Sequence, residues 1–462
     1  MQAQSWLYEL RSNFWFVPSV MLAVSIGLAF GLLEIDQHIK PKMIDDVAWI
    51  YSGTPDGARE VLGTIAGSMI TVAGLVFSIT MVVLTLASQQ FGPRLLITFM
   101  RDRGNQIVLG TFVSTFIYCL LVLRAVRSGE DDLEFVPYIS VTAALVLALT
   151  SLGVLIFFIH HVSQLIQAPN VIAAVSADLD AAIDEIFPEK LGEDEAAVVS
   201  DSGEKDVPEH FERDAQSVVA EDSGYLRAVD RDEILQLATQ RDLIIQLHYR
   251  PGHFIIGGSL LARVWPGARL DEEVSRKINE ALVLGPQRTL EQDVEFAIDQ
   301  LVEVAVRALS TGINDPFTAM NCTDRLGAAL VRIGERRMPS PYRYDNHGKL
   351  RVIADAVTIR SVVDAAFNQI RQHGRDDVAV MIRLLETITI VGERVRHAQL
   401  REALLRQAHL IADAGREAIP DQADRQALES RLHGALRTLA ELSHGRASTQ
   451  LSNAQHSHPA SD

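Results

Sequence analysis

Long apolar runs set the first third of the chain apart from the rest. Four of them stand out, at about 14–33, 61–93, 106–123 and 136–159. A helix needs roughly 20 apolar residues to cross the hydrocarbon core of a bilayer, and each run is close to that length or longer. Residues 1–168 are therefore predicted to form a four-span transmembrane domain.

The second of these runs is predicted to form a helix with one polar side. No charged side chain occurs from residue 61 to residue 93, yet alternating steps of four and three from Thr64 to Gln89 meet polar residues at six of eight positions, with Leu75 and Val82 as the exceptions. Because such steps follow one face of a helix, they make a single stripe: Thr64, Ser68, Thr71, Ser78, Thr85 and Gln89. Lipid is a poor environment for this stripe, so it should face another helix or water.

Two interpretations of the stripe remain open. Hydroxyl and amide side chains could line a path for water and ions. Alternatively, the stripe could be a seam for close helix packing, since Gly63, Gly67 and Gly74 lie in the same run and small residues let membrane helices approach each other. An oligomer that places this helix around an axis would satisfy both interpretations.

Beyond the fourth run the pattern becomes that of a soluble α+β region. Residues 189–222 hold 12 acids and 3 bases, a composition typical of a solvated linker. Short apolar runs with Pro-Gly and Gly-Gly turns follow, and then amphipathic helical periodicity. The predicted parts are a helix with an acidic linker over 169–216, a small β-module over 217–268, a helical bundle over 269–444 and a disordered tail over 445–462. The fold class is a mostly α membrane protein, with a four-helix transmembrane domain and a cytoplasmic α+β region.

Charge and motif content argue against several functions. The formal net charge of −17 disfavours binding to nucleic acids, which needs clustered Lys and Arg. The sequence has no G-x-x-x-x-G-K-[ST], H-E-x-x-H or G-x-S-x-G motif, so neither an enzymatic activity nor a cofactor is expected. His160 and His161 are adjacent, cannot face one way on a helix, and have no second pair at metal-ligand spacing. No metal site is expected.

The most distinctive soluble motif is RALSTGINDPFTAMNC, which starts at Arg307. Gly312 suits a left-handed helix C-cap, and Asp315 followed by a proline suits the start of the next helix. A helical hairpin turn would explain the motif without any function. The preceding helix carries residues spaced by four, so a polar site is the competing interpretation. That candidate site comprises Glu295, Asp299, Glu303, Arg307, Asn314 and Asp315.

Two segments resemble a known family. They are TVAGLVFSITMVVLTLASQQFGPRLL, within the polar-sided run, and QDVEFAIDQLVEVAVRALSTGINDPFTA, which leads into the hairpin motif. Together they resemble a bacterial family of predicted membrane proteins, catalogued as domain of unknown function 2254, over roughly residues 10–430. The resemblance implies a four-span membrane part with a soluble C-terminal region. It implies no activity, substrate or catalytic residue.

These observations favour a multi-pass protein of the bacterial inner membrane. An even number of spans places both termini on one side. That side is predicted to be the cytoplasm because no signal for export of the large soluble part is recognised, and the loop with Arg94, Arg101 and Arg103 favours the same orientation. The leading hypothesis is a channel-like or transport-related homo-oligomer, assembled or gated by its cytoplasmic region, with the lipid bilayer and ions as partners. The alternative is a membrane-anchored scaffold or sensor that conducts nothing.

Overall fold

The chain folds into two compact units, Met1–Val171 and Ile172–Asp462. The computed structural model describes residues 15–38, 51–92, 102–128, 135–165, 167–187, 206–395 and 397–455. The predicted acidic linker falls largely on 188–205, outside the described residues.

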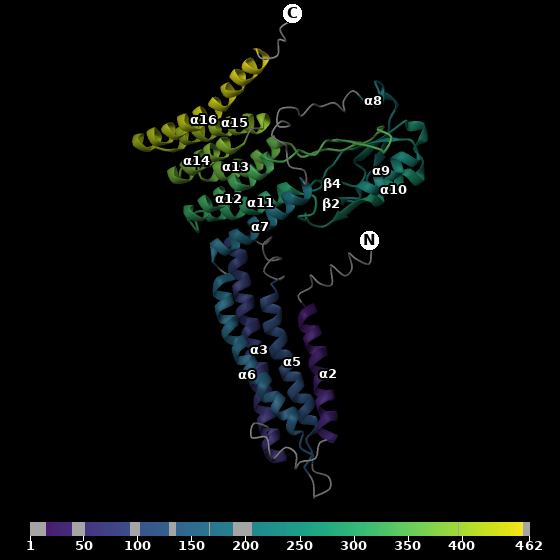
Figure 1. Ribbon diagram of the computed structural model, residues 1–462, viewed down its shortest axis with the longest axis vertical. Coiled ribbons are helices and arrows are strands. Elements are labelled where there is room, and N and C mark those ends of the chain that lie inside the picture. Colours follow the sequence, from purple (N-terminus) through teal and green to yellow (C-terminus); the bar gives the residue numbers. More distant parts are fainter. Residues whose placement is uncertain are drawn as a thin grey trace, which may run out of the picture. The chain divides into compact units, whose positions relative to one another are not determined.

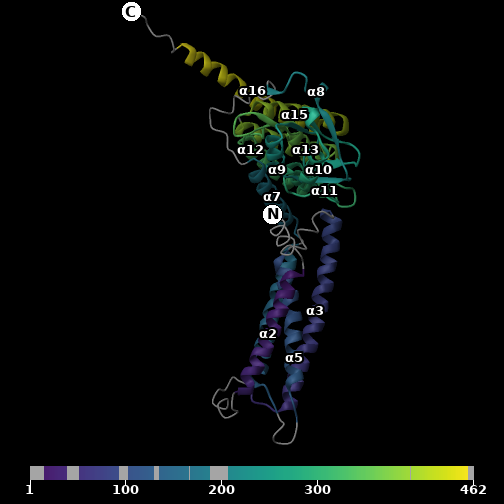
Figure 2. The same cartoon turned by 90° about the vertical axis from the view of Figure 1, so that its right-hand side faces the viewer.

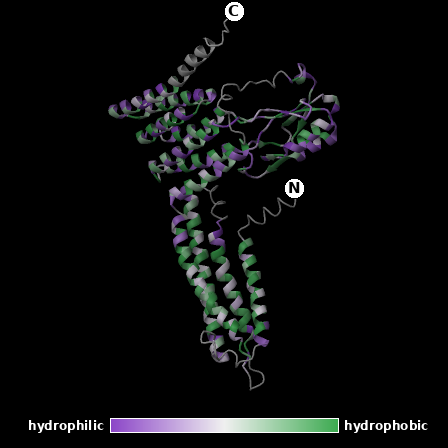
Figure 3. Cartoon of the chain, viewed as in Figure 1, coloured by the Kyte–Doolittle hydropathy of each residue, from purple (hydrophilic) through white to green (hydrophobic). Residues whose placement is uncertain are grey.

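The first unit is a bundle of four long helices (Figure 1). They are α2 (Phe16–His38), α3 (Pro55–Phe91), α5 (Arg103–Ala125) and α6 (Tyr138–Leu165). All four are long and apolar enough to span a membrane, as Figure 3 shows by the hydrophobic colouring along them. The four predicted spans are confirmed, and α3 continues for 37 residues, well beyond the length that a span requires.

Helix α5 forms the centre of the bundle. It contacts each of the other three helices, and Figure 2 shows it between α2 and α3. Of its apolar window, 61% is buried, against 17–22% for the other helices. Phe112, Tyr118 and Val122 on α5 are almost fully enclosed and belong to the hydrophobic core. The three outer helices therefore pack around α5 and expose most of their surface.

Two sheets form the β part of the second unit. A five-stranded sheet has the order β1-β5-β3-β8-β7, and a three-stranded sheet has the order β4-β2-β6. The strands are β1 (Gln216–Val219), β2 (Gly224–Val229), β3 (Ile244–Leu247), β4 (Phe254–Ile255), β5 (Leu260–Trp265), β6 (Leu282–Gly285), β7 (Tyr342–Tyr344) and β8 (Leu350–Ile353). Helices α9 (Arg231–Gln240) and α10 (Glu272–Ala281) contact these strands and share their apolar core.

The β part extends beyond the predicted module of residues 217–268. Strand β6 pairs with β2, and β8 pairs in parallel with β3, although both lie in the segment predicted to be helical. Parallel pairing needs a long crossover connection, and here the chain between β3 and β8 includes two long helices. These late strands have only three or four residues each, too few to show a period of two in the sequence.

Six helices complete the second unit as three successive hairpins. They are α11 (Val294–Ala308), α12 (Pro316–Gly334), α13 (Ile359–His373), α14 (Val378–Arg394), α15 (Ala398–Ala418) and α16 (Gln422–Gln455). Helices α11, α13 and α15 contact one another in one column, and α12, α14 and α16 do so in a second. Figure 1 shows these helices on one side of the unit and the sheets with α9 and α10 on the other.

Helices lie at both ends of the described part of this unit. Helix α7 (Ala168–Ile186) precedes the sheets, and Asp180 and Asp184 on it pair with Arg332 of α12. A single turn, α8 (Phe211–Asp214), leads into β1. Helix α16 continues to Gln455, whereas the sequence predicts a disordered tail from residue 445. No proline interrupts 445–455, so the helix can continue; residues 456–462 lie outside the described residues.

Candidate functional site

The polar stripe of α3 lies on the outer surface of the bundle. All six of its residues are exposed: Thr64, Ser68, Thr71, Ser78, Thr85 and Gln89. The opposite face is buried through residues such as Leu62, Ala73, Val76 and Val83, which pack on the other helices. In the described bundle, α3 therefore packs on its neighbours through the face opposite to the stripe.

Four hydroxyl groups of the stripe donate hydrogen bonds to their own helix. Ser68 donates to the carbonyl of Thr64 and Thr71 to that of Gly67, each at 2.8 Å. Ser78 donates to Gly74 at 2.9 Å, and Thr85 donates to Met81 at 2.8 Å. This intrahelical pattern satisfies each hydroxyl hydrogen, which lowers the cost of placing it away from water. The oxygen atoms remain able to accept.

Three glycines of α3 lie on the surface that carries the polar stripe. A Cβ atom added at Gly63, Gly67 or Gly74 would meet nothing within 4 Å. No neighbouring side chain of the described bundle thus occupies the space in front of them. Close approach of another helix backbone is what small residues allow in membranes, and on α3 this space is open.

Polar contacts inside the bundle were missed by the sequence analysis. Asp36, near the end of α2, accepts hydrogen bonds from the backbone N–H groups of Ile139 and Ser140, both at 2.9 Å, and from the Ser140 hydroxyl at 2.6 Å. The Tyr118 hydroxyl donates to the Ser140 carbonyl at 3.0 Å. Asp36 therefore caps α6 from a different helix. An acidic residue at the end of an apolar run was its only sequence signal.

A second polar contact joins α5 and α6 at the other end of the bundle. Asp102 caps α5 by accepting from the backbone of Gly104 and Asn105, and it also lies 2.6 Å from Nε2 of His161. The His161 ring stacks on Phe157. Among the residues that the structure describes, no group of three His, Cys, Asp or Glu side chains could hold a metal ion.

In the second unit, the first two acids of the predicted polar site each pair with an arginine from outside α11. Arg250 binds both carboxylate oxygens of Glu295 at 2.9 Å and lies 3.3 Å from Asp355. Burial opposes the ionisation of Glu295, but hydrogen bonds from Ser361 and Arg250 outweigh it and lower the pKa of Glu295. Glu295 is therefore held as a carboxylate.

Arg288 connects the second acid to the start of α11. It binds Asp293 at 2.9 and 3.0 Å and Asp299 at 2.8 Å, and its guanidinium lies 5.0 Å from the centre of the Phe296 ring. Asp293 also accepts from the Phe296 N–H as the N-cap of α11. The sequence spacing correctly placed the acids on one face but gave no sign of Arg250 or Arg288.

The rest of the predicted site has local roles. Glu303 pairs with Arg307 one turn later, at 3.2 Å. Asp315 caps α12 by accepting from the Thr318 N–H at 3.1 Å and from its hydroxyl at 2.7 Å, as predicted. The left-handed residue of the turn is Asn314, with φ of 51°, and not Gly312. The C-cap of α11 is Leu309, in an ordinary right-handed conformation, and not Gly312.

Four membrane-length helices in the described residues, three of them packed around the buried α5, are followed by a folded α+β unit and define a membrane protein with a large extramembrane part. The chain belongs to the family described as predicted membrane protein (DUF2254), whose model matches residues 11–389. It is 32% identical over 426 residues to the uncharacterized proteins Mb1321c of Mycobacterium bovis and Rv1290c of Mycobacterium tuberculosis. Each alignment covers 90% of this chain and 78% of the relative. No solved structure matches the chain.

Proposed function

We propose that this protein is a channel-like or transport-related homo-oligomer of the bacterial inner membrane, in which α3 helices of several copies face one another. The observation that supports this proposal is the outward polar face of α3. The buried face of α3 packs on its own bundle through residues such as Leu62, Ala73 and Val76. Among the described residues, four hydroxyl groups of the second, polar and glycine-containing face bond to their own helix, and an assembly would bring a partner against this face.

Energetics favour a second copy over lipid against this face. In a bilayer the association of helices depends on van der Waals packing and interhelical hydrogen bonds, since lipid and Leu are equally apolar. The oxygens of Ser68, Thr71 and Ser78 can still accept hydrogen bonds, and the open glycines allow close backbone approach. Apolar Leu75 and Val82 lie on the same side, 56% and 59% exposed, and would gain packing contacts.

The proposed path is passive, and the soluble unit assembles or gates it from the cytoplasm. Helix α3 has no charged side chain after Glu60, and coupled proton transport generally uses ionisable groups inside the membrane. Both termini are assigned to the cytoplasm, so a reporter fused after the C-terminus should give a cytoplasmic signal. The proposal includes no catalytic step.

The alternative is a membrane-anchored scaffold or sensor, and one observation favours it. Four of the five hydroxyl groups of the stripe already have acceptors on their own helix, so these four groups do not need water. In that case the same face of α3 is a dry seam between copies. The soluble unit would then bind a partner while the membrane part only anchors it.

Cysteine accessibility separates these functions. Cys119 and Cys322, both free and buried, are first replaced by alanine. Single cysteines at Thr71, Ser78 and Thr85 should then react with a membrane-impermeant thiol reagent if the face lines water. Ala73, 4% exposed, serves as the buried control, and Phe77, 45% exposed but off the stripe, as the outward control.

The outcomes of this experiment differ for each proposal. Reaction along the stripe with protection at both control positions supports the water path, and ion flux into liposomes should accompany it. Protection of the whole stripe, combined with failed assembly of Ser78→Leu, supports the dry seam and contradicts conduction. A monomer in native mass spectrometry from mild detergent would contradict assembly through α3 altogether.

A further inference from the structure

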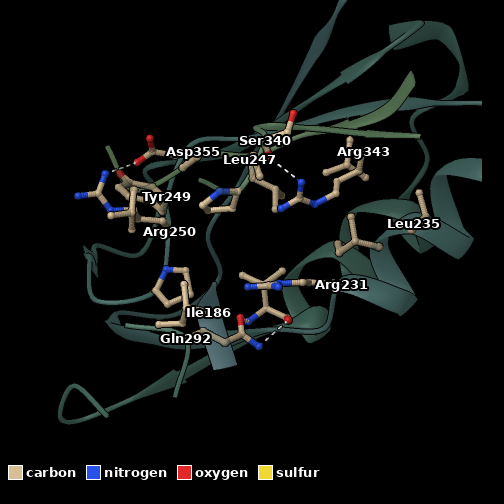
Figure 4. A pocket seen from close by; sticks show the side chains of 18 of the residues that line it. Ile186, Arg231, Leu235, Leu247, Tyr249, Arg250, Gln292, Ser340, Arg343 and Asp355 are labelled. Atoms are coloured by element: carbon tan, nitrogen blue, oxygen red, sulfur yellow. Dashed lines mark hydrogen bonds and ion pairs between the residues drawn. The ribbon is translucent and has the colours of Figure 1, made fainter. Parts of the chain in front are cut away.

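The second unit contains a cavity of about 240 Å³ beside α9. Strands β3 and β8, the start of α9 and the segment before β7 contribute its walls. Most of the lining is apolar, with Ile234, Leu235, Leu247 and Val352 among the residues that form it. Three arginines, Arg231, Arg250 and Arg343, also line it (Figure 4).

Only one of these arginines is neutralised by neighbouring acids. Arg250 binds Glu295 and Asp355, the latter also on the cavity wall. Arg343 donates instead to the backbone carbonyls of Ser340 and Tyr342. Among the described residues, neither Arg343 nor Arg231 has an ion-pair partner.

The two remaining arginines repel each other. Figure 4 shows Arg343 extending from its strand into the central space, with Arg231 below it. Burial, and then the charge of Arg231, lower the pKa of Arg343. The carboxylate of Asp232 also lies along the wall, but it is not among the groups that act on Arg343. Arg343 is half-buried and lies near the charge of the exposed Arg231, which is unfavourable for folding, and a bound anion would relieve this repulsion.

We propose that this cavity binds a small organic anion. A carboxylate or phosphate group would lie between Arg231 and Arg343, where planar guanidinium groups bind such oxygens with two parallel hydrogen bonds. The apolar part of the ligand would contact Ile234, Leu235 and Leu247. This combination of apolar walls and a few convergent polar groups is typical of small-molecule sites. The inference is independent of how α3 assembles.

Calorimetry on the full chain tests the proposal. The protein is placed in phosphatidylcholine nanodiscs and titrated with phenyl phosphate, with benzoate as the carboxylate counterpart. Benzamide, which has the same ring but no charge, tests the need for an anion, and inorganic phosphate tests the need for an apolar body. Phenyl phosphate should bind at least tenfold more tightly than either of these two controls.

Substitutions then locate the site. Arg343→Gln and Arg231→Gln should each weaken phenyl phosphate binding about tenfold or more, the loss expected for a charge-assisted hydrogen bond. Arg343→Lys keeps the charge and should bind more tightly than Arg343→Gln. Arg276→Gln is the matched control, since Arg276 pairs with Glu280 on the exposed side of α10, and it should leave binding unchanged.

The melting temperature without ligand is a second readout, and Arg343→Gln should not lower it even though the same substitution weakens binding. Because Arg343→Gln removes repulsion, its melting temperature should equal or exceed that of the wild type. Unchanged binding in both Gln variants, or equal affinity for inorganic phosphate and phenyl phosphate, would overturn the proposal. So would an Arg343→Gln variant with a lower melting temperature and undiminished affinity, because the arginine would then have only a structural role.

Discussion

Replacement of Asp36 by alanine should strongly destabilise the four-helix bundle. Asp36 is only 7% exposed, and its carboxylate receives three hydrogen bonds from residues at the start of α6. The first backbone N–H groups of a helix have no intrahelical acceptor, and α6 obtains its acceptor from α2. The variant therefore removes a helix cap and a contact between two helices at once.

The magnitude follows from the groups left without a partner. Loss of an ordinary N-cap reduces stability by about 0.5–2 kcal/mol. A buried donor left unsatisfied costs about 1–3 kcal/mol, and the Ser140 N–H is such a donor. We expect a loss of about 2–4 kcal/mol for Asp36→Ala. Asp36→Asn keeps one acceptor oxygen but no charge, so its stability should lie between those of Asp36→Ala and the wild type.

Reversible unfolding in mixed detergent and dodecyl sulfate micelles measures this difference. The matched control is Glu34→Ala. Glu34 lies on the same last turn of α2 but is exposed, and its ion pair with His38 is long, at 4.0 Å. Such a surface pair contributes about 0–1 kcal/mol. A double-mutant cycle with Ser140→Ala should show coupling between Asp36 and Ser140. Equal effects of Asp36→Ala and Glu34→Ala would refute the capping role.

Two further predictions concern the second unit. Asp315→Ala should lower its free energy of unfolding by about 0.5–2 kcal/mol in urea titrations, because the cap to Thr318 is lost; lost function with an unchanged melting curve would instead place Asn314 and Asp315 in a binding site. His397 is 3% exposed with neither ring nitrogen bonded among the described residues, and burial lowers its pKa. Its contribution to stability should be complete above pH 6.5 and be lost as the pH falls toward the lowered pKa. His397→Leu should remove the fall in stability below pH 6.5. His409→Leu, at an exposed position of α15, the helix that His397 precedes, should leave that fall unchanged.

Hydropathy was sufficient to predict the membrane part of the fold. A membrane span requires one property, a long run of apolar residues, and this property can be recognised directly in the sequence. The strands were harder, because β8 has four residues and is defined by its pairing with β3, about a hundred positions earlier. Such a strand is stabilised by the strands that it pairs with, and its own residues do not indicate which strands those are.

The polar site illustrates the same limit at the level of single residues. Spacing by four placed Glu295 and Asp299 on one face of α11, since helix geometry is local. Their partners come from elsewhere: Arg250 is 45 positions from Glu295, and Arg288 is 11 positions from Asp299. The Asp36 cap spans 103 positions. Sequence patterns predict which side a residue faces, but tertiary structure decides what it meets there.

The length of α3 adds a constraint on what its outward face can do. At 1.5 Å per residue, the 25 steps from Thr64 to Gln89 cover about 38 Å, more than the roughly 30 Å of the hydrocarbon core. The stripe therefore extends along the full membrane thickness of a tilted or upright helix. A local packing motif needs only one or two turns. In the proposed assembly, the stripe, which Leu75 and Val82 interrupt, would serve as a path across the membrane or as a seam that holds two copies together from one surface to the other, and both would bring a second α3 against this face.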